Sequence, residues 1–408
     1  LGLGVLAGDV AALISERDIL SGEARRSADF VQRVEALQAF RRNGRAGAQA
    51  HHADAGACER VDQAARQFQR LLPPAKSGSG ADAGQTGLLL ALAYPDRVAL
   101  ARTPGDVRYL LASGRGARLP ESEIRLRQPC IVAASLDAGE TEGQMYSAAP
   151  LAVDTLRVHL AAHIRTEDVV RWDPPQQIVI ARREERFGAL VLDGKPLSHP
   201  DPEIVRAAML EGVRRLGIEA LPWTREAREW QARVLSLRQW LPDETWPDVS
   251  DVTLQETLAD WLAPWLDGMT RRDHLARLDM RAILQSRLDW DMGRRLEEGA
   301  PTQLEVPSGS KLHLEYIPGE FPVLKVKLQE MFGLADTPRV AWGKVPVTLH
   351  LLSPAQRPIQ VTQDLRGFWE RTYPEVKKEL KGKYPKHPWP DDPWSATPTR
   401  RAKRRSRQ

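Results

Sequence analysis

Residues 338–393 constrain the fold of this chain more than any other stretch, because they read PRVAWGKVPVTLHLLSPAQRPIQVTQDLRGFWERTYPEVKKELKGKYPKHPWPDDP. Apolar side chains alternate with others over 345–351, which is the period of a half-buried strand. Thr362 is placed to cap a following helix. Pro374 disfavours helical backbone in the residue before it, so it should end that helix and open a second one, with Gly382 at the second C-cap. The stretch therefore predicts strands, two short helices and a proline-rich extended end.

The rest of the chain alternates between helical and strand-like periodicity. Apolar residues recur at helical spacing before about residue 75 and again over 201–300, whereas 97–200 and 301–352 carry short alternating runs. The prediction is an α+β multidomain protein. Its parts are a helical bundle at 1–75, a linker or loop at 76–86, an OB-like β-barrel domain at 87–200, a helical segment at 201–300, a mixed α/β C-terminal domain at 301–395 and a basic disordered tail at 396–408.

Five candidate strands in the middle of the chain favour an OB-like barrel. They cover 98–102, 107–112, 131–136, 144–148 and 178–182, with a glycine turn at 113–116 and a helix near 156–164. Barrels of this kind bind single-stranded nucleic acid through a basic groove with stacking aromatic residues. Aromatic residues are few here, so we expect contacts with the nucleic-acid backbone more than stacking. The candidate groove residues are Arg97, Arg102, Arg108, Tyr109, Arg115 and Arg118.

Basic charge is concentrated at the end of the chain. Without its last nine residues the net charge of +4 becomes −2, since 52 Lys and Arg then face 54 Asp and Glu. Such a tail is typical of a disordered arm and often touches nucleic acid. The lysines of the preceding helix have a plainer alternative role, which is to keep an amphipathic helix soluble. The candidates in this region are Lys377, Lys381, Lys383, Lys386, Arg400, Arg401, Lys403, Arg404 and Arg405.

All twelve tryptophans follow residue 171, and five of them lie between Trp223 and Trp261. Trp223, Trp230 and Leu237 recur every seven residues, which places them on one face of a helix. Tryptophans at helical spacing are far more often core than platforms for nucleic-acid bases. We therefore predict a tryptophan-rich core for the second half of the chain.

The cysteines and histidines indicate neither a disulfide framework nor a metal site. Cys58 and Cys130 stand far apart without a CxxC partner, so we expect reduced thiols and a cytoplasmic protein. The group His51, His52 and Cys58 has no fourth ligand nearby, and HLAAH at 159–163 lacks the glutamate of a zinc protease. No apolar run approaches the roughly 20 residues of a membrane helix, so no membrane contact is expected.

The chain resembles the HrpB-type ATP-dependent RNA helicases, bacterial members of the DEAH/RHA-like group in helicase superfamily 2. The runs that carry the resemblance are VTLHLLSPAQRPIQVTQDL, FWERTYPEVKKELKGKYPKHPWPDDP, YLLASGRGARLP, REERFGALVLDGKPL and ARLDMRAILQSRLDW, and together they extend over nearly the whole chain. The resemblance implies that 1–75 is the end of a helical ratchet domain and that the middle is OB-like. It also implies that these parts hold single-stranded RNA, or DNA as the alternative, while RecA-like domains close and open around ATP.

The chain departs from that family because neither RecA-like domain is recognisable in it. It has no G-x-x-x-x-G-K-[ST] loop and no DEAH sequence, and the nearest approach, GADAGQT at 80–86, is one residue short and has Gln in place of Lys. We therefore expect the C-terminal half of a longer helicase, without a cofactor of its own and inactive as an ATPase by itself. ATP and magnesium would belong to the missing N-terminal RecA-like domains, which would be its partners.

Two functions remain open from the sequence. The first is an accessory part that grips single-stranded RNA for a helicase. The second is a protein-docking module, with PKHPWPDDPW at 385–394 as part of its surface and an unknown protein partner. The nearly balanced charge of the body favours the second, whereas contacts with phosphates predict RNA binding that depends steeply on salt.

Overall fold

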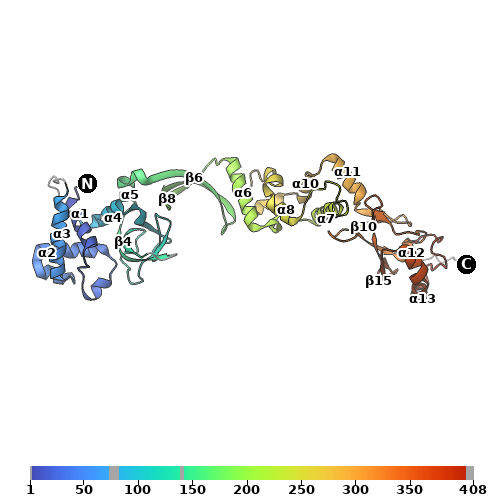
Figure 1. The fold of residues 1–408 in the computed structure, drawn as a ribbon, viewed down its shortest axis with the longest axis horizontal. Helices are drawn as coiled ribbons and strands as arrows, with labels where there is room; N and C mark the ends of the chain where they lie inside the picture. The colour runs from blue at the N-terminus through green and yellow to red at the C-terminus, as the bar shows by residue number, and fades with distance from the viewer. Residues whose placement is uncertain (1, 73–81, 138–141, 401–408) are drawn as a thin grey trace. The chain divides into compact units, whose positions relative to one another are not determined.

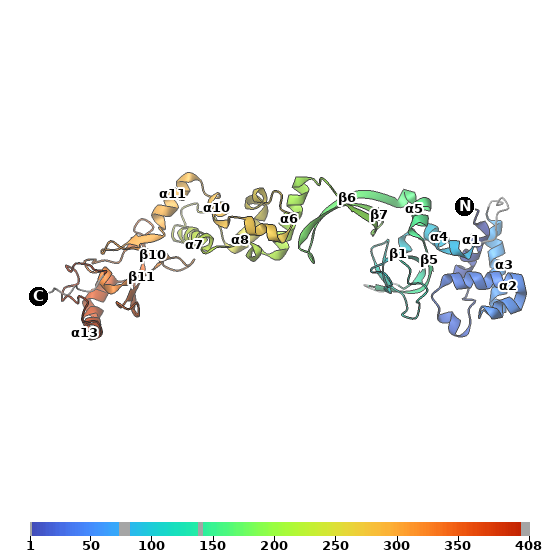
Figure 2. The same ribbon diagram turned by 180° about the vertical axis from the view of Figure 1, so that it is seen from behind.

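The chain divides into two compact units in the computed structural model, which describes residues 2–72, 82–137 and 142–400. The first unit holds Leu1–Val169 and Ala181–Ser198, and the second holds Val170–Ile180 and His199–Gln408. Each unit has its own hydrophobic core. Figures 1 and 2 show their elements from opposite sides.

Helices fill the start of the first unit, as predicted. They are α1 (Gly4–Ser15), α2 (Phe30–Ala50), α3 (Ala55–Arg70) and α4 (Thr86–Ala93), with a 3-10 turn η1 (Gly22–Arg26) between the first two. Aspartates cap two of them, because Asp29 accepts a hydrogen bond from the Val31 amide and Asp54 accepts one from the Ala57 amide. α1 packs against α3, and α4 packs against the strands that follow.

A closed five-stranded barrel follows these helices. Its strands are β1 (Val98–Ala101), β2 (Arg108–Leu111), β3 (Gly116–Arg118), β4 (Cys130–Leu136) and β5 (Glu142–Pro150), in the order β1-β2-β3-β5-β4. β3 pairs with β5 in parallel and the other pairs are antiparallel. Four of the five predicted strands are confirmed as barrel strands. The fifth, at 178–182, is a strand as predicted but lies in another sheet, and β3 takes its place in the barrel directly after the predicted turn. β3 is only three residues long and begins with two small buried residues, so it leaves no alternating pattern in the sequence.

The residues after the barrel form a different structure, so the prediction of one OB-like domain over 87–200 is too broad. They are α5 (Val153–His159) and a three-stranded sheet of β6 (Ile164–Asp173), β7 (Ile178–Phe187) and β8 (Leu190–Pro196), in the order β6-β7-β8. Charged side chains cover much of this sheet, and Arg183 pairs with Asp168 at 2.7 Å. The predicted strand at 178–182 is the start of β7. β6 and β7 each contribute residues to both units.

The second unit begins with helices, as predicted for 201–300. They are α6 (Pro202–Leu216), α7 (Arg225–Trp240), α8 (Asp251–Glu256), α9 (Leu258–Trp261), α10 (Met280–Gln285) and α11 (Trp290–Gly299). Trp230 and Trp261 are buried, which confirms the tryptophan-rich core, although Trp265 is 42% exposed. Gly212 of α6 lies against the ring of Trp172, where a β-carbon would come within 2.5 Å of it. The helix therefore needs glycine at that position.

A five-stranded sheet and a pair of helices complete the second unit. The sheet has the order β15-β14-β11-β10-β9, and its central pair, β11 with β14, is parallel. The bounds are β9 (Gln303–Glu305), β10 (Lys311–Glu315), β11 (Val323–Lys327), β14 (Thr348–Leu352) and β15 (Pro358–Thr362), with a separate hairpin of β12 (Arg339–Val340) and β13 (Val345–Pro346). The strand predicted at 345–351 is confirmed as β13 and β14.

The helices after this sheet differ from the prediction at both ends. α12 (Leu365–Gly367) continues through a π turn (Phe368–Thr372) into α13 (Tyr373–Lys383). The cap is Asp364, whose carboxylate accepts from the Gly367 amide at 2.8 Å, and not Thr362, which ends β15. Pro374 does stand in the first turn of α13, as predicted. Gly382 is not the C-cap, because the helix runs on to Lys383 without a left-handed residue there.

The proline-rich end packs back on the second unit. The Tyr373 hydroxyl donates to the Pro390 carbonyl at 3.0 Å, and the Trp389 indole donates to the Tyr384 carbonyl at 3.0 Å. The first residues of the tail predicted at 396–408 are bound to the second unit, since the Thr399 amide donates to the Gln329 carbonyl at 3.0 Å. The prediction of disorder is therefore wrong for 396–400, and 401–408 lie outside the described residues.

Cys58 and Cys130 are free, buried thiols, as predicted. Burial raises the pKa of Cys58 to about 11 and that of Cys130 to about 12, so both stay protonated at neutral pH. In the described part of the chain, no helix has the length and apolar character needed to cross a membrane.

Candidate nucleic-acid interface

Two of the predicted groove residues lie directly opposite each other on the outside of the barrel. β2 and β3 are antiparallel, and their register pairs Arg108 with Arg118. Both side chains are exposed, while Tyr109 and Leu111 of β2 point into the barrel and are buried. Successive residues of a strand face opposite sides, so the two arginines form a cross-strand pair on the solvent face.

Acidic neighbours balance this arginine pair. Arg108 forms an ion pair with Asp106 at 3.3 Å, and Arg118 pairs with Glu121. The hydrogen bond from the Arg108 backbone amide, together with its guanidinium, holds the pKa of Asp106 below its usual range. Like charges directly opposite each other destabilise a sheet, and the two carboxylates offset that repulsion. Each arginine is therefore held at the surface by an exchangeable acidic partner.

Arg97 and Arg115 meet at a second place on the barrel. Both line a hollow of about 230 Å³, together with Ser113 and Asp137. The Arg97 guanidinium lies 4.3 Å from the centre of the Tyr94 ring and donates to the Ala134 carbonyl at 3.0 Å. Arg97 is therefore partly engaged in the fold.

The remaining predicted barrel residues are Arg102 and Tyr109, and they have different surroundings. Arg102 stands exposed in the connection between β1 and β2. Tyr109 is fully buried, and its hydroxyl donates to the Leu126 carbonyl at 3.1 Å and the Gln128 carbonyl at 3.0 Å. Burial raises the pKa of this phenol to about 12. The prediction that Tyr109 lines the groove is wrong, because the residue next to an outward arginine on a strand must point inward.

The predicted lysines of the second unit are mostly engaged with acidic side chains. Lys377 is 17% exposed and pairs with Asp391, and Lys383 pairs with Glu379 at 2.6 Å. Lys381 and Lys386 are exposed. Arg400 donates to the Ser308 carbonyl at 3.2 Å, so it is docked on the body. The four other tail candidates, Arg401, Lys403, Arg404 and Arg405, lie outside the described residues.

Sequence reasoning missed Tyr146, whose ring is 58% exposed on β5. Its hydroxyl donates to the Asp137 carboxylate at 3.3 Å. The sequence did hold a signal for Tyr146, because the strand at 144–148 was predicted and Met145 beside the tyrosine is apolar. Met145 is indeed buried. Alternation along that strand puts Tyr146 on the same outer face as the arginines.

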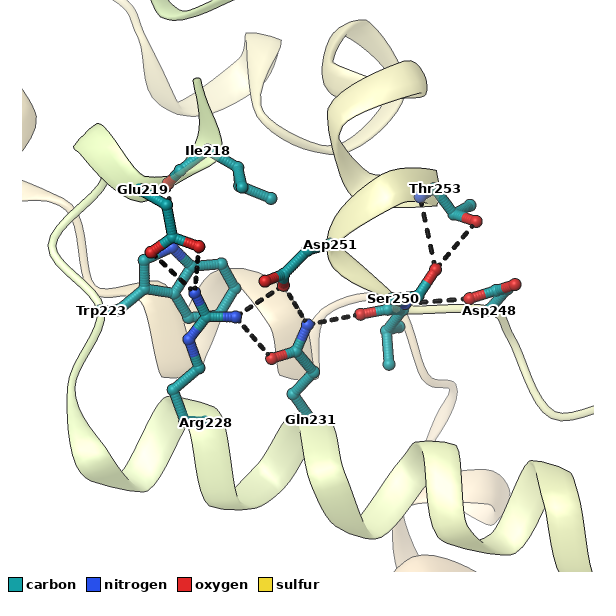
Figure 3. A network of polar contacts seen from close by, with 10 residues as sticks. Ile218, Glu219, Trp223, Arg228, Gln231, Asp248, Ser250, Asp251 and Thr253 are labelled. Atoms are coloured by element: carbon teal, nitrogen blue, oxygen red, sulfur yellow. Dashed lines mark hydrogen bonds and ion pairs between the residues drawn. The ribbon is translucent and has the colours of Figure 1, made fainter. Parts of the chain in front are cut away.

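Another concentration of charge, around Arg228 in the second unit, is a structural clamp. In Figure 3 its guanidinium is stacked on the Trp223 ring and bonds to Glu219, Asp251 and Gln231. The guanidinium carbon lies 3.6 Å from the centre of the ring, and the bonds to Asp251 and Gln231 are 2.6 and 2.9 Å long. Gln231 in turn donates to the Val249 carbonyl at 2.7 Å. These bonds join α7 to the start of α8 and to the turn before α7. The Arg228 donors are used within the fold, so this network does not form a ligand site.

The residues directly before α4 form a capped turn. Asp82 accepts a hydrogen bond from the amide of Gly84 at 3.0 Å, and the turn Ala83–Gln85 leads directly into the helix. The end of the predicted linker at 76–86 is thus the start of α4. Over residues 2–72, 82–137 and 142–400, no group of three or more His, Cys, Asp or Glu side chains could hold a metal ion.

Comparisons with known proteins identify two parts of the chain. Residues 163–197, which include β6 to β8, match the family described as the connector region of the ATP-dependent RNA helicase HrpB, and residues 261–393 match the HrpB family described as ATP-dependent helicase C-terminal. The chain is 40% identical over 331 residues to the ATP-dependent RNA helicase HrpB of Escherichia coli strain K12, which covers 81% of this chain and 41% of that protein.

A solved structure extends the similarity. The crystal structure of the E. coli DExH-box NTPase HrpB matches 98% of this chain and 49% of that chain, at 34% identity and a TM-score of 0.50. The chain thus spans less than half the length of these relatives. Residues 163–197 and 261–393 thus match the HrpB connector and C-terminal descriptions, and the chain fits the C-terminal half of an HrpB-type helicase.

Proposed function

We propose that this chain grips single-stranded RNA as the accessory part of an HrpB-type ATP-dependent RNA helicase, with the outer face of the barrel as the contact. The observation that carries the proposal is the exposed cross-strand pair of Arg108 and Arg118. Two arginines on adjacent strands lie about 5 Å apart at the backbone, and their long side chains reach neighbouring phosphates of an extended strand.

The topology supports an OB-like identity for the barrel. An OB-fold is a five-stranded Greek-key barrel whose second and third strands, with the loops joining strands 1–2 and 4–5, bind oligonucleotides. Here the arginine pair stands on β2 and β3, and Arg102 stands in the connection between β1 and β2. The helices α1 to α3 would then be the end of the ratchet domain.

The proposed grip positions RNA without reading its sequence. A phosphate approaching Arg108 or Arg118 competes with Asp106 or Glu121 for the same guanidinium, so binding exchanges one anionic partner for another. Contacts with phosphates fix register and orientation but carry no base information. RecA-like domains would bind ATP and magnesium and drive the strand past this surface in the cytoplasm, where the two thiols stay reduced. Single-stranded DNA could occupy the same surface, and Lys381, Lys386 and Arg400–Arg405 would add contacts from the second unit.

The fold weakens one support of the protein-docking alternative, which is the proline-rich run. Trp389 of the proline-rich run is buried, and the Pro393 carbonyl accepts from the Gly333 amide at 3.0 Å. A run that is packed on its own unit does not present the free extended helix that proline-binding partners recognise.

The test compares RNA binding by the Arg108→Gln, Arg118→Gln double variant with wild type. We expect it to bind oligouridine and oligoadenosine of equal length about equally less tightly, because both lose the same phosphate contacts. Arg214→Gln with Arg215→Gln, two exposed arginines of α6 that also pair with an acidic side chain, is the matched control and should bind as wild type does. If the barrel variant lost affinity for only one of the two oligonucleotides, the arginines would read bases. If the barrel variant and the control bound RNA equally well, the outer face of the barrel would not be the RNA contact.

A further inference from the structure

The outer face of the barrel leads from the arginine pair to a hollow of about 530 Å³, within the first unit. The hollow lies where β4 and β5 meet the turn η1, the end of α1 and the start of α2. Its lining includes an exposed aromatic ring, two hydroxyls and three guanidinium groups, from Tyr146, Ser135, Ser147, Arg25, Arg26 and Arg33, together with the carboxylates of Glu16 and Asp18. This combination of side chains occurs in sites that hold single nucleotides of an extended strand.

Strand register makes the hollow continuous with the arginine pair. β3 and β5 are parallel, and Arg118 pairs with Gln144. Tyr146 follows two residues later on the same face, about 7 Å further along the strand. The three side chains therefore form a path from a phosphate contact to an exposed ring. That distance is close to the spacing between successive nucleotides of an extended strand.

An irregularity between β4 and β5 opens the hollow. The register shifts on both sides of Ser135, which pairs with Ser147. Tyr146 and Ser147 both reach the surface although they are neighbours, whereas Met145 before them and Ala148 after them are buried. Such bulges change the direction of side chains, and they are common beside functional sites. Here the bulge places two hydroxyls next to the ring.

The basic side of the hollow is fixed in place. Arg25 and Arg26 end η1, and two residues later the Ala28 amide donates to the buried Glu123 carboxylate at 2.6 Å. The Ala148 amide of β5 donates to the Ala28 carbonyl at 2.8 Å, which ties the turn to the barrel. Among the residues that the structure describes, neither Arg25 nor Arg26 forms an ion pair, and both are exposed.

The floor of the hollow is electrically neutral. Arg33 is bound by both oxygens of Asp18, at 2.7 and 3.1 Å, and its side chain is only 8% exposed. The positive charge available to a ligand therefore comes from Arg25 and Arg26 at the rim, and the exposed carboxylate of Glu16 offsets part of it.

We propose that this hollow binds one nucleotide of single-stranded RNA. The base stacks on the Tyr146 ring, the phosphate meets Arg25 and Arg26, and the hydroxyls of Ser135 and Ser147 face the ribose. Every base offers a flat face to an aromatic ring, so the site accepts any of the four. This inference rests on the proposed function, since the nucleotide is part of the same strand that the arginine pair holds.

The test uses the whole chain and single-stranded RNA that carries one 2-aminopurine, whose fluorescence falls when it stacks. Wild type should lower the emission on binding. Tyr146→Ala should abolish that drop and weaken binding at least fivefold, whereas Tyr146→Phe, which keeps the ring, should retain both properties. Arg25→Gln with Arg26→Gln should weaken binding, and Arg214→Gln with Arg215→Gln on α6 should leave it unchanged.

The outcomes separate this inference from the proposed function. If Arg108→Gln with Arg118→Gln weakens binding but Tyr146→Ala changes neither affinity nor emission, the nucleotide site is wrong and the barrel grip stands. If Tyr146→Phe is as weak as Tyr146→Ala, the tyrosine supports the fold through its hydroxyl and does not stack. If wild type binds no single-stranded RNA, both proposals fail.

Discussion

At the scale of single residues, the surroundings of an arginine determine what it can do. Arg118 stands exposed on the barrel, whereas Arg233 of α7 is 2% exposed. Arg233 donates to the Ala300 carbonyl at 2.5 Å and pairs with Glu297 at 2.8 Å. Its charge thus satisfies the C-terminal end of α11, where the helix dipole favours a cation. Composition alone treats the two arginines as equivalent.

Replacing Arg233 by methionine should destabilise the second unit by about 2–3 kcal/mol, because carbonyls at the end of α11 lose a buried donor. Methionine keeps most of the apolar volume of the arginine side chain, so the loss of stability reports the missing charge and its hydrogen bonds. All twelve tryptophans lie in this unit, so tryptophan fluorescence in a urea titration follows it selectively. Arg294→Met, on the exposed side of α11, is the control. Equal urea midpoints for the two variants would contradict the role of Arg233 at the end of α11.

The residue scale also shows where sequence reasoning succeeds and fails. Alternation correctly predicted β2, and the arginine at 108 faces outward as its pattern required. The same alternation places Tyr109, which follows the outward Arg108, inside the barrel. It places Tyr146, which follows the apolar Met145, outside. Choosing residues by type, without following their direction along the strand, caused both errors.

At the scale of elements, short pieces were the hardest to predict. The long helices α2, α3, α6 and α7 were evident from apolar spacing, because their periodicity repeats over several turns. β3 has three residues and is specified by its neighbours in the closed barrel. The cap of α12 was misplaced by two residues because Thr362 and Asp364 are both good capping residues, and only the register of β15 decides between them.

The Asp364 cap predicts a pH dependence for the second unit. The Gly367 amide, followed by the Arg371 side chain, holds the pKa of Asp364 below its usual value. A carboxyl group whose pKa is lower in the folded chain stabilises the fold above its unfolded pKa of about 4, and this contribution is lost as the pH falls through the folded value. Asp364→Asn, which keeps the capping oxygen, should therefore melt below wild type at pH 7 and approach it at pH 3. Melting curves that stay equally far apart at both pH values would contradict the charge effect.

At the scale of the whole molecule, the chain has two units with separate cores, and we assign them different roles. The barrel unit holds the proposed RNA contacts, and the second unit holds the tryptophan core and the packed proline-rich end. The family resemblance predicted the OB-like middle and the C-terminal domain, but not that a charged three-stranded sheet follows the barrel. Only the apolar start of β7 was predicted as a strand, because β6 and the second half of β7 carry charged residues of both signs without a regular apolar face.

The purified chain should show no ATPase activity, with or without RNA. Its sequence contains no phosphate-binding loop, and Asp82 caps the turn before α4. Phosphate release measured at saturating ATP and magnesium should equal that of a mock preparation. Turnover that RNA stimulates, and that is absent from the mock preparation, would overturn the assignment of hydrolysis to RecA-like domains.

The central claim is that the outer face of the barrel grips RNA by its phosphates, and the most direct test is the salt dependence of binding. On a single strand, each neutralised phosphate adds about 0.7 to the slope of log affinity against log salt concentration. Arg108→Gln with Arg118→Gln removes two contacts, so its slope for oligouridine should be shallower than that of wild type by about 1.4. Arg214→Gln with Arg215→Gln on α6 should keep the slope of wild type. Parallel lines for all three proteins would contradict the claim, because the arginine pair would then neutralise no phosphate.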